Sequence, residues 1–120
     1  MTHSAMVRNL EVSGEASRAA AVFAVLGNDR RVQILLALLR HGELNVNVLA
    51  RMVGLSQSAL SQHLKRLREC DLVSTRRDRQ NIHYRVTAPV VEPLLATYMQ
   101  AGRTAISTQD SSSRADTGSH

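Results

Sequence analysis

The chain has 120 residues, of which 43% are hydrophobic and 21% are charged, and its net charge is +5 at pH 7. This length and composition suit one domain of about 100–150 residues with one modest core, and they exclude a wholly disordered chain. The single cysteine excludes an intramolecular disulfide, and the 2% aromatic content excludes stacking platforms for single-stranded nucleic acid.

No apolar run reaches the length of a membrane span, and no signal-peptide pattern opens the sequence. We therefore expect a soluble, cytoplasmic protein without contact to a membrane. The positive charge is concentrated: residues 51–85 contain eight Lys or Arg and three Asp or Glu, so this stretch alone carries the whole excess. Such an asymmetry is typical of a surface that binds a polyanion, although a solvated charged face would give the same count.

Apolar spacing and glycines predict the first two helices. From Glu15, apolar residues recur every three or four positions up to Gly27, which indicates an amphipathic helix. A second helix is capped by Asn28 or Asp29 and ends at Gly42. Because it is apolar nearly all round, we expect it at the centre of the core.

The next two segments predict a helix-turn-helix. Asn47 caps a short helix over residues 48–53, and Gly54 ends it. Ser56 then caps a longer helix that runs to about Cys70. Leucines spaced four and three residues apart give this longer helix one inward face, and polar and basic residues cover its other face.

After the longer helix, apolar residues alternate instead of recurring with a helical period. Residues 72–75 and 82–86 predict two β-strands, joined by a polar hairpin tip over residues 76–81 that carries three arginines. A final helix contains Pro93 in its first turn and ends at Gly102. The expected fold is therefore mainly α with a small β-hairpin, in the order α-α-α-α-β-β-α, which is a winged helix-turn-helix.

The expected organisation has three parts. Residues 1–13 are polar and unpatterned and form a disordered N-terminus. Residues 14–102 form the winged helix-turn-helix domain. Residues 103–120 hold eight Ser or Thr and form a disordered tail.

The exposed face of the longer helix carries the side chains needed to read double-stranded DNA. Base edges in the major groove present donors and acceptors that Gln, Ser and His can match, and the flanking phosphates attract Lys and Arg. No acidic residue lies between Leu55 and Arg68, which is unusual for an ordinary surface helix. The candidate DNA-binding residues on this helix and on the hairpin are Ser56, Gln57, Ser58, Ser61, Gln62, His63, Lys65, Arg66, Arg76, Arg77, Arg79 and Gln80.

Several motifs resemble the ArsR/SmtB family of bacterial winged-helix repressors. The resemblance extends over residues 15–100, and the motifs that carry it are Asp29-Arg30-Arg31-Val32-Gln33-Ile34-Leu35, Gly42-Glu43-Leu44-Asn45-Val46, Val53-Gly54-Leu55-Ser56-Gln57-Ser58-Ala59-Leu60-Ser61-Gln62-His63-Leu64, Leu67-Arg68-Glu69, Leu72-Val73, Arg76-Arg77-Asp78 and Ile82-His83-Tyr84. The resemblance implies a homodimer, joined through the first and last helices, that represses transcription by occupying operator DNA. The candidate interface residues are Ala16, Ala19, Ala20, Phe23, Leu26, Leu94, Leu95 and Tyr98.

The sequence departs from that family where metal sensors of the family bind their ions. Arsenic and cadmium sensors have Cys-Val-Cys at the start of the third helix, whereas this chain has Asn45-Val46-Asn47, and amides are poor ligands for soft metals. Zinc and nickel sensors use His, Asp and Glu on the last helix, where this chain offers Glu92 and no histidine. We therefore expect neither a metal site nor a cofactor.

Three alternatives stay open. A thiol-responsive repressor could act through Cys70, although this cysteine has no partner and its spacing from Leu67 favours simple packing. A winged-helix module that binds protein would have an eroded basic face, and a nonspecific DNA-coating protein would not need side chains that read bases. No enzyme is expected, because the sequence contains no nucleophile elbow, phosphate-binding loop or zinc-hydrolase motif.

Overall fold

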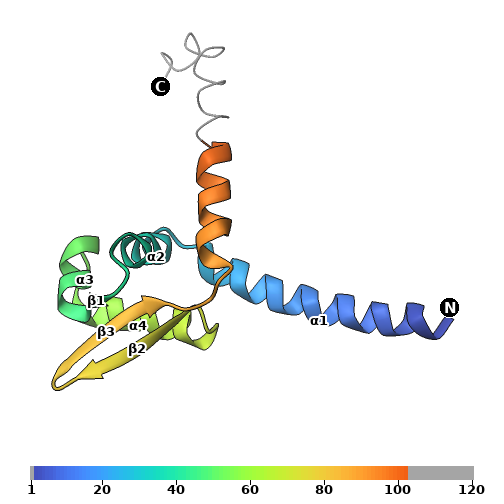
Figure 1. Cartoon of the computed structure of the whole chain (residues 1–120), viewed down its shortest axis with the longest axis horizontal. Helices are drawn as coiled ribbons and strands as arrows, with labels where there is room; N and C mark the ends of the chain where they lie inside the picture. Colours follow the sequence, from blue (N-terminus) through green and yellow to red (C-terminus); the bar gives the residue numbers. More distant parts are fainter. Residues whose placement is uncertain (1, 103–120) are drawn as a thin grey trace, which may run out of the picture. The chain divides into compact units, whose positions relative to one another are not determined.

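The computed structural model describes the backbone of residues 2–102 and the side chains of residues 12–102 (Figure 1). The predicted tail over residues 103–120 lies outside the described residues. The chain divides into two units, Met1–Ala88 and Pro89–His120. Among the described residues, no helix is long and apolar enough to cross a membrane.

The first unit combines helices with one small sheet. Its elements in chain order are α1 (Thr2–Leu26), α2 (Asp29–His41), β1 (Leu44–Asn45), α3 (Val46–Val53), α4 (Gln57–Glu69), β2 (Val73–Asp78) and β3 (Asn81–Val86). In the second unit, residues 91–102 are helical, with Pro93 in the first turn as predicted. The predicted class, a mainly helical fold with a β-hairpin wing, is confirmed.

The core of the first unit surrounds α2. Every residue from Arg31 to Leu39 is buried or half-buried, as expected for a helix that is apolar nearly all round. Burial of a large aliphatic side chain contributes about 1.5–3 kcal/mol, so the leucines of α2, α3 and α4 dominate the stability of this unit. Its buried hydrophobic side chains are Val25, Ile34, Leu35, Leu38, Leu49, Ala50, Val53, Leu60, Leu64, Leu67, Leu72, Val73 and Tyr84.

The turn between α3 and α4 follows the predicted glycine and serine. Gly54 adopts a left-handed conformation with φ of 67°, and the N–H groups of Gly54 and Leu55 donate back to the last turn of α3. Glycine suits this position because it has no Cβ to disfavour a positive φ. The hydroxyl of Ser56 accepts the N–H of Ala59 at 3.1 Å and begins α4, as predicted.

The helix starts differ from the prediction in two places. Helix α1 begins at Thr2 rather than near Glu15, so residues 2–13 are helical. This segment contains no proline, and one glycine in a helix costs only about 1 kcal/mol, so Gly14 does not end it. Helix α3 begins at Val46, and its cap is Asn45 rather than Asn47.

The sheet is larger than predicted. Leu44 and Asn45 form a short strand, β1, which the sequence analysis missed because two residues show no alternation. Strand β3 lies in the middle of the antiparallel order β1-β3-β2 and pairs with β1 through Tyr84 and His83 (Figure 1). The side chain of Tyr84 is buried, which ties the sheet to the core.

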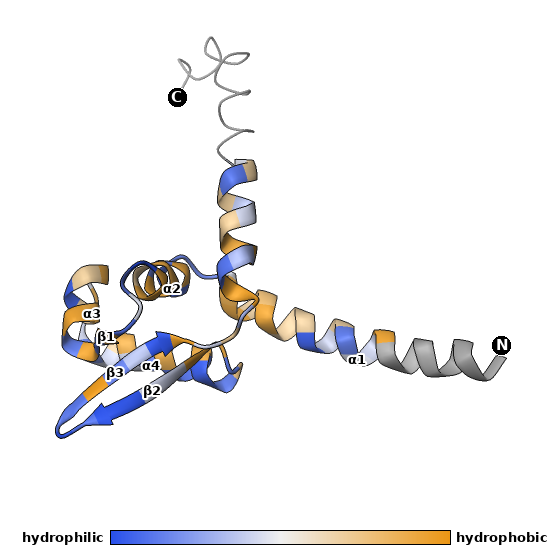
Figure 2. Cartoon of the chain, viewed as in Figure 1, coloured by the Kyte–Doolittle hydropathy of each residue, from blue (hydrophilic) through white to orange (hydrophobic). Residues whose placement is uncertain are grey.

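The hairpin tip is shorter than predicted. Pairing between β2 and β3 continues to Asp78 and Asn81, so the loop consists of Arg79 and Gln80 alone. The predicted tip residues Arg76 and Arg77 therefore lie on β2. Hydrophobic alternation could not predict this part of the strand, because its residues are charged. Figure 2 shows that hydrophilic residues occupy the hairpin tip and most of β2.

Replacing Gly54 with alanine is expected to lower the free energy of unfolding by about 1 kcal/mol, because a Cβ disfavours the left-handed backbone. An added Cβ would be 4.0 Å from its nearest neighbour, at Arg30, so backbone strain rather than a clash sets this loss. Gly14→Ala is the control, and it is expected to stabilise helix α1 by about 0.5–1 kcal/mol. Urea unfolding measures both variants, and equal losses in both would contradict this account.

Candidate DNA interface

The outer face of α4 brings together most of the predicted DNA-reading side chains. Helix α4 buries its leucines, and the opposite face carries polar and basic residues, with no acid before Glu69 at its last position. Ser56, at the cap, is occupied by its contact to the backbone of the first turn. The exposed predicted residues of this helix are Gln57, Ser58, Ser61, Gln62, Lys65 and Arg66.

The two asparagines at the family's thiolate positions have structural contacts in this chain. The side chain of Asn45 accepts the N–H of Asn47 at 2.7 Å and caps α3. The side chain of Asn47 in turn accepts a hydrogen bond from the amide of Gln57. Asn47 therefore connects the start of α3 to the first residue of α4, and one amide hydrogen of Gln57 is already engaged.

His63 is less accessible than its predicted neighbours. Its imidazole is half-buried, and its Nδ1 accepts a hydrogen bond of 3.3 Å from Nε of Arg31 on α2. Burial lowers the pKa of His63, and the positive charges of Arg31 and Arg30 lower it further. The ring is thus neutral at pH 7 and contacts α2 at the edge of the exposed face of α4.

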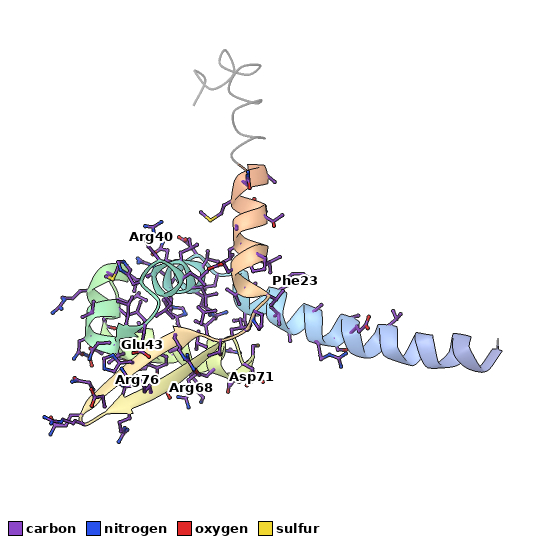
Figure 3. The ribbon with its side chains drawn as sticks, viewed as in Figure 1. Phe23, Arg40, Glu43, Arg68, Asp71 and Arg76 are labelled. Carbon is purple, nitrogen blue, oxygen red and sulfur yellow. The ribbon has the colours of Figure 1, made fainter. Side chains whose placement is uncertain are left out.

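The basic residues of the wing are divided into paired and unpaired ones. Arg76 donates to both carboxylate oxygens of Glu43, with contacts of 2.7–3.2 Å (Figure 3). This arginine lowers the pKa of the Glu43 carboxyl, so the ion pair persists well below neutral pH. Arg77 and Arg79 are exposed, and the structure shows no ion pair for either within residues 12–102. Their charge is available to a polyanion, as is that of Arg85 on β3, which is also exposed and has no ion pair among the described residues.

Arg79 occupies a position where the backbone favours glycine. Its φ is 61°, in the left-handed region, at the first residue of the two-residue hairpin loop. Hairpin loops of this length require a positive φ, and a residue with a Cβ is destabilised there by about 1–2 kcal/mol. The strain therefore lies in the hairpin loop, at a residue whose side chain is exposed.

The predicted dimer residues are largely exposed in the single chain. Phe23, labelled in Figure 3, is 59% exposed on α1 of the first unit, and Tyr98 is 73% exposed in the second unit. The predicted alanines of α1 are exposed as well, whereas Leu26, Leu94 and Leu95 are half-buried. Each unit thus carries an apolar surface that the described residues leave open to solvent.

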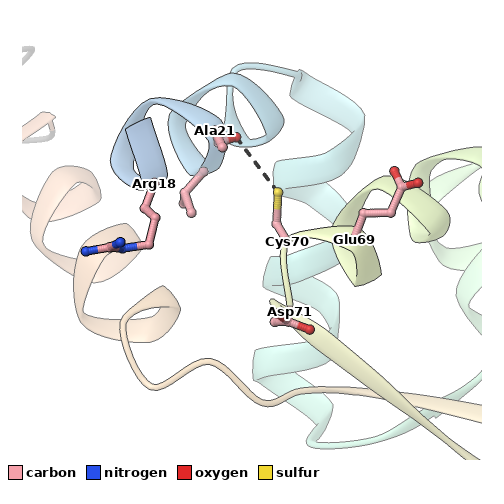
Figure 4. Close-up of a pocket in the computed structure, with 6 residues that line it drawn as sticks. Arg18, Ala21, Glu69, Cys70 and Asp71 are labelled. Carbon is pink, nitrogen blue, oxygen red and sulfur yellow. Dashed lines mark hydrogen bonds between the residues drawn. The ribbon is translucent and has the colours of Figure 1, made fainter. Parts of the chain in front are cut away.

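Cys70 does not continue the buried stripe as fully as its spacing predicted. It is half-buried, and its thiol donates to the backbone oxygen of Ala21 at 3.9 Å (Figure 4). A pocket beside it is lined by Arg18, Val22, Glu69 and Asp71 as well. Within the described part of the chain, no three His, Cys, Asp or Glu residues are grouped so that they could hold a metal ion.

The contacts that the sequence analysis missed join distant parts of the chain. Arg30 and Arg31 of α2 contact Val53 and His63, and Glu43 contacts Arg76. Apolar periodicity carries no information about such pairs, since each joins residues 23 or more positions apart.

Comparisons with known proteins agree with this architecture. Residues 28–75 match the family model for bacterial regulatory proteins of the arsR family. The chain is 43% identical over 95 residues to the nodulation protein NolR of Rhizobium meliloti, which covers 79% of this chain and 77% of that protein. It is 39% identical to the transcriptional activator HlyU of Vibrio cholerae, over 71% of this chain and 78% of that protein.

Solved structures give the same result. The crystal structure of NolR from Sinorhizobium fredii has a TM-score of 0.71 at 44% identity, over 76% of this chain and 90% of that chain. The homodimeric winged helix-turn-helix domain Mb0332 of Mycobacterium bovis has a TM-score of 0.72 at 29% identity, over 78% of this chain and 86% of that chain. This chain therefore belongs to the arsR family of bacterial regulatory proteins and is a transcriptional regulator.

Proposed function

We propose that the chain is a homodimeric repressor that binds one class of operator in double-stranded DNA. Helix α4 enters the major groove and reads bases, the wing contacts phosphates or the minor groove, and occupation of the operator blocks transcription. The regulator works in the cytoplasm, at the nucleoid, without a thiolate metal site and without catalytic activity.

One observation carries this proposal. The exposed face of α4 presents amides and hydroxyls, which both donate and accept, and it lies in the same unit as a wing with exposed arginines. Base edges are read by such amphoteric groups, whereas cations alone would suffice for coating DNA. The amides and hydroxyls of this face therefore favour sequence-specific binding over a nonspecific DNA-coating role, and its basic residues favour DNA binding over a protein-binding module.

The decisive experiment is selection of bound sequences from random duplex DNA by the full chain. A sequence-specific dimer is expected to enrich an inverted repeat whose half-sites lie about 34–36 Å apart, one turn of the double helix. A nonspecific coating protein would enrich no motif. A protein-binding module would retain no duplex at moderate salt.

The helix and the wing are expected to contribute differently. Gln62→Ala removes a side chain that reads bases. It should weaken the binding free energy for the operator by about 1–3 kcal/mol and leave that for a scrambled duplex unchanged. Arg79→Gly removes a cation that neutralises phosphate, so both duplexes should bind more weakly. The fold is retained, because the backbone of residue 79 has a positive φ that glycine adopts without strain. The slope of log affinity against log salt concentration should become shallower by about one for each phosphate that is no longer neutralised, or by about two in a dimer.

Titrations on both duplexes at several salt concentrations measure these effects. Thermal unfolding of Arg79→Gly controls for the fold. If Arg79→Gly lost sequence discrimination while Gln62→Ala lost only general affinity, the assigned roles would be reversed.

Neutralising Glu43 is expected to strengthen binding to every duplex. Glu43→Gln removes a negative charge from the wing region and frees the guanidinium of Arg76 for phosphate. Affinity should rise a few-fold at low salt, and the salt slope should steepen by up to about one per protomer. Glu15→Gln, an exposed acid on α1, is the matched control and should have a smaller effect. Fluorescence anisotropy measures both variants, and weaker binding by Glu43→Gln would show that the ion pair orients the wing productively.

The exposed apolar surfaces are expected to join two copies. Light scattering at micromolar concentration should give twice the chain mass of 13.2 kDa. Phe23→Glu and Tyr98→Glu should shift the protein towards the monomer, since each places a charge in the proposed interface. Met52→Glu, at a side chain 47% exposed on α3, is the control and should leave the dimer intact. A monomeric wild-type protein would exclude the proposed assembly.

A further inference from the structure

Arg31 connects the last turn of α1 to the middle of α4, although it lies on neither helix. Its Nη1 donates to the backbone oxygen of Val25 at 3.0 Å, and its Nε donates to Nδ1 of His63 at 3.3 Å. Val25 is buried and His63 is half-buried, so both acceptors are held by their surroundings. A guanidinium is planar and presents its donors in a fixed geometry, so a single side chain sets the separation of the two acceptors.

The contact specifies the protonation of the histidine. Nδ1 must keep a lone pair in order to accept the N–H of Arg31, so the proton of the neutral ring lies on Nε2. The charged groups that act on this ring are Arg31 and Arg30, both cations of α2, and together with burial they lower the pKa of His63. The surroundings of the ring thus favour the same neutral form that the hydrogen bond requires.

We propose that Arg31 is a positioning residue for DNA recognition, which acts through the neutral ring of His63 to hold α4 in a fixed orientation relative to the end of α1. This inference rests on the proposed function, in which α4 reads the operator. Arg31 touches no base in this scheme. Its contribution is that the amides and hydroxyls of α4 meet the base edges in one geometry, so it governs discrimination between sequences.

Protonation of His63 breaks this link. A proton on Nδ1 would face the donating N–H of Arg31, and the imidazolium would be repelled by both arginines. Because the folded-state pKa lies below the ordinary value of 6.5, the link is complete above that value and is lost as the pH falls through the lower folded value. Mild acid should therefore loosen α4 even though acid otherwise adds positive charge to a DNA-binding surface.

The first test needs no DNA, so its failure is separable from failure of the proposed function. Nitrogen-15 chemical shifts of the His63 ring report which nitrogen carries the proton. We expect Nε2–H alone in the wild type, and averaging between both tautomers together with a higher pKa in Arg31→Met. Arg30→Met is the matched control: it removes an equal charge from α2, but Arg30 donates to Val53 rather than to His63, so the single tautomer should persist. A wild-type ring protonated on Nδ1 would overturn the proposal.

The second test measures discrimination as the ratio of affinities for the selected operator and a scrambled duplex. Arg31→Met should reduce this ratio at least about fivefold, the equivalent of one misplaced base contact. In a His63→Ala background, which lacks any side-chain acceptor, Arg31→Met should cause little further loss. Equal losses in the two backgrounds would show that Arg31 acts without His63 and would overturn the proposal.

A third test, the pH dependence of the affinity ratio, does not need Arg31→Met and therefore stands even if that variant fails to fold. The wild-type ratio should be constant above about pH 6.5 and should fall as the pH drops below 6.5 through the lowered folded-state pKa of His63. In His63→Asn, the amide oxygen can replace Nδ1 as an acceptor and does not titrate, so its ratio should change at least about threefold less over the same range. His83 on β3 is present unchanged in both proteins, so any contribution from it cancels in this comparison. Identical pH profiles for the two proteins would contradict the proposed link.

Discussion

The rest of the structure depends on the burial of α2. A helix whose central residues are all at least half-buried must be covered by other elements, and the first unit covers it with α3, α4 and the sheet. Because its position is fixed by apolar contacts, its polar first turn can support long side chains that reach outward. Arg30 and Arg31 extend from that turn to the end of α3 and to α4. The hydrophobic core thus indirectly sets the geometry of the polar, exposed face of α4.

The helices of this fold were predictable because their signals are local. Gly42, Gly54 and Ser56 each act through their own backbone or through a neighbour within four residues, and the structure places all three at the predicted helix ends. Where the local signal is weak, the prediction is wrong. Asn45 and Asn47 can each cap α3 by local chemistry. In the structure Asn45 is the cap, since it ends the strand that pairs with β3 and the helix begins directly after it.

The outline of the candidate site was predictable for the same reason, whereas its internal contacts were not. The polar face of α4 follows from helical periodicity, so the exposure of Gln62 and Lys65 needed no structure. The partners of Gln57, His63 and Arg76 lie on α3, on α2 and before β1 respectively. Such pairs are set by how elements pack, and a single sequence shows the donors and acceptors without showing which of them meet.

These contacts change how the positive charge of the chain is used. Arg76 is neutralised by Glu43, and Arg30 and Arg31 donate to backbone and imidazole acceptors, so these three arginines serve the fold. On the wing, Arg77, Arg79 and Arg85 stay exposed, with no ion pair among the described residues. Arg79, at the outer end, is held in a backbone conformation that glycine would adopt with less strain. A fold that only needed a tight turn would gain by losing that side chain. Since long-range attraction to DNA falls off within about 8–10 Å in physiological salt, charge placed at the far end of a projecting hairpin does more for DNA binding than the same charge near the core.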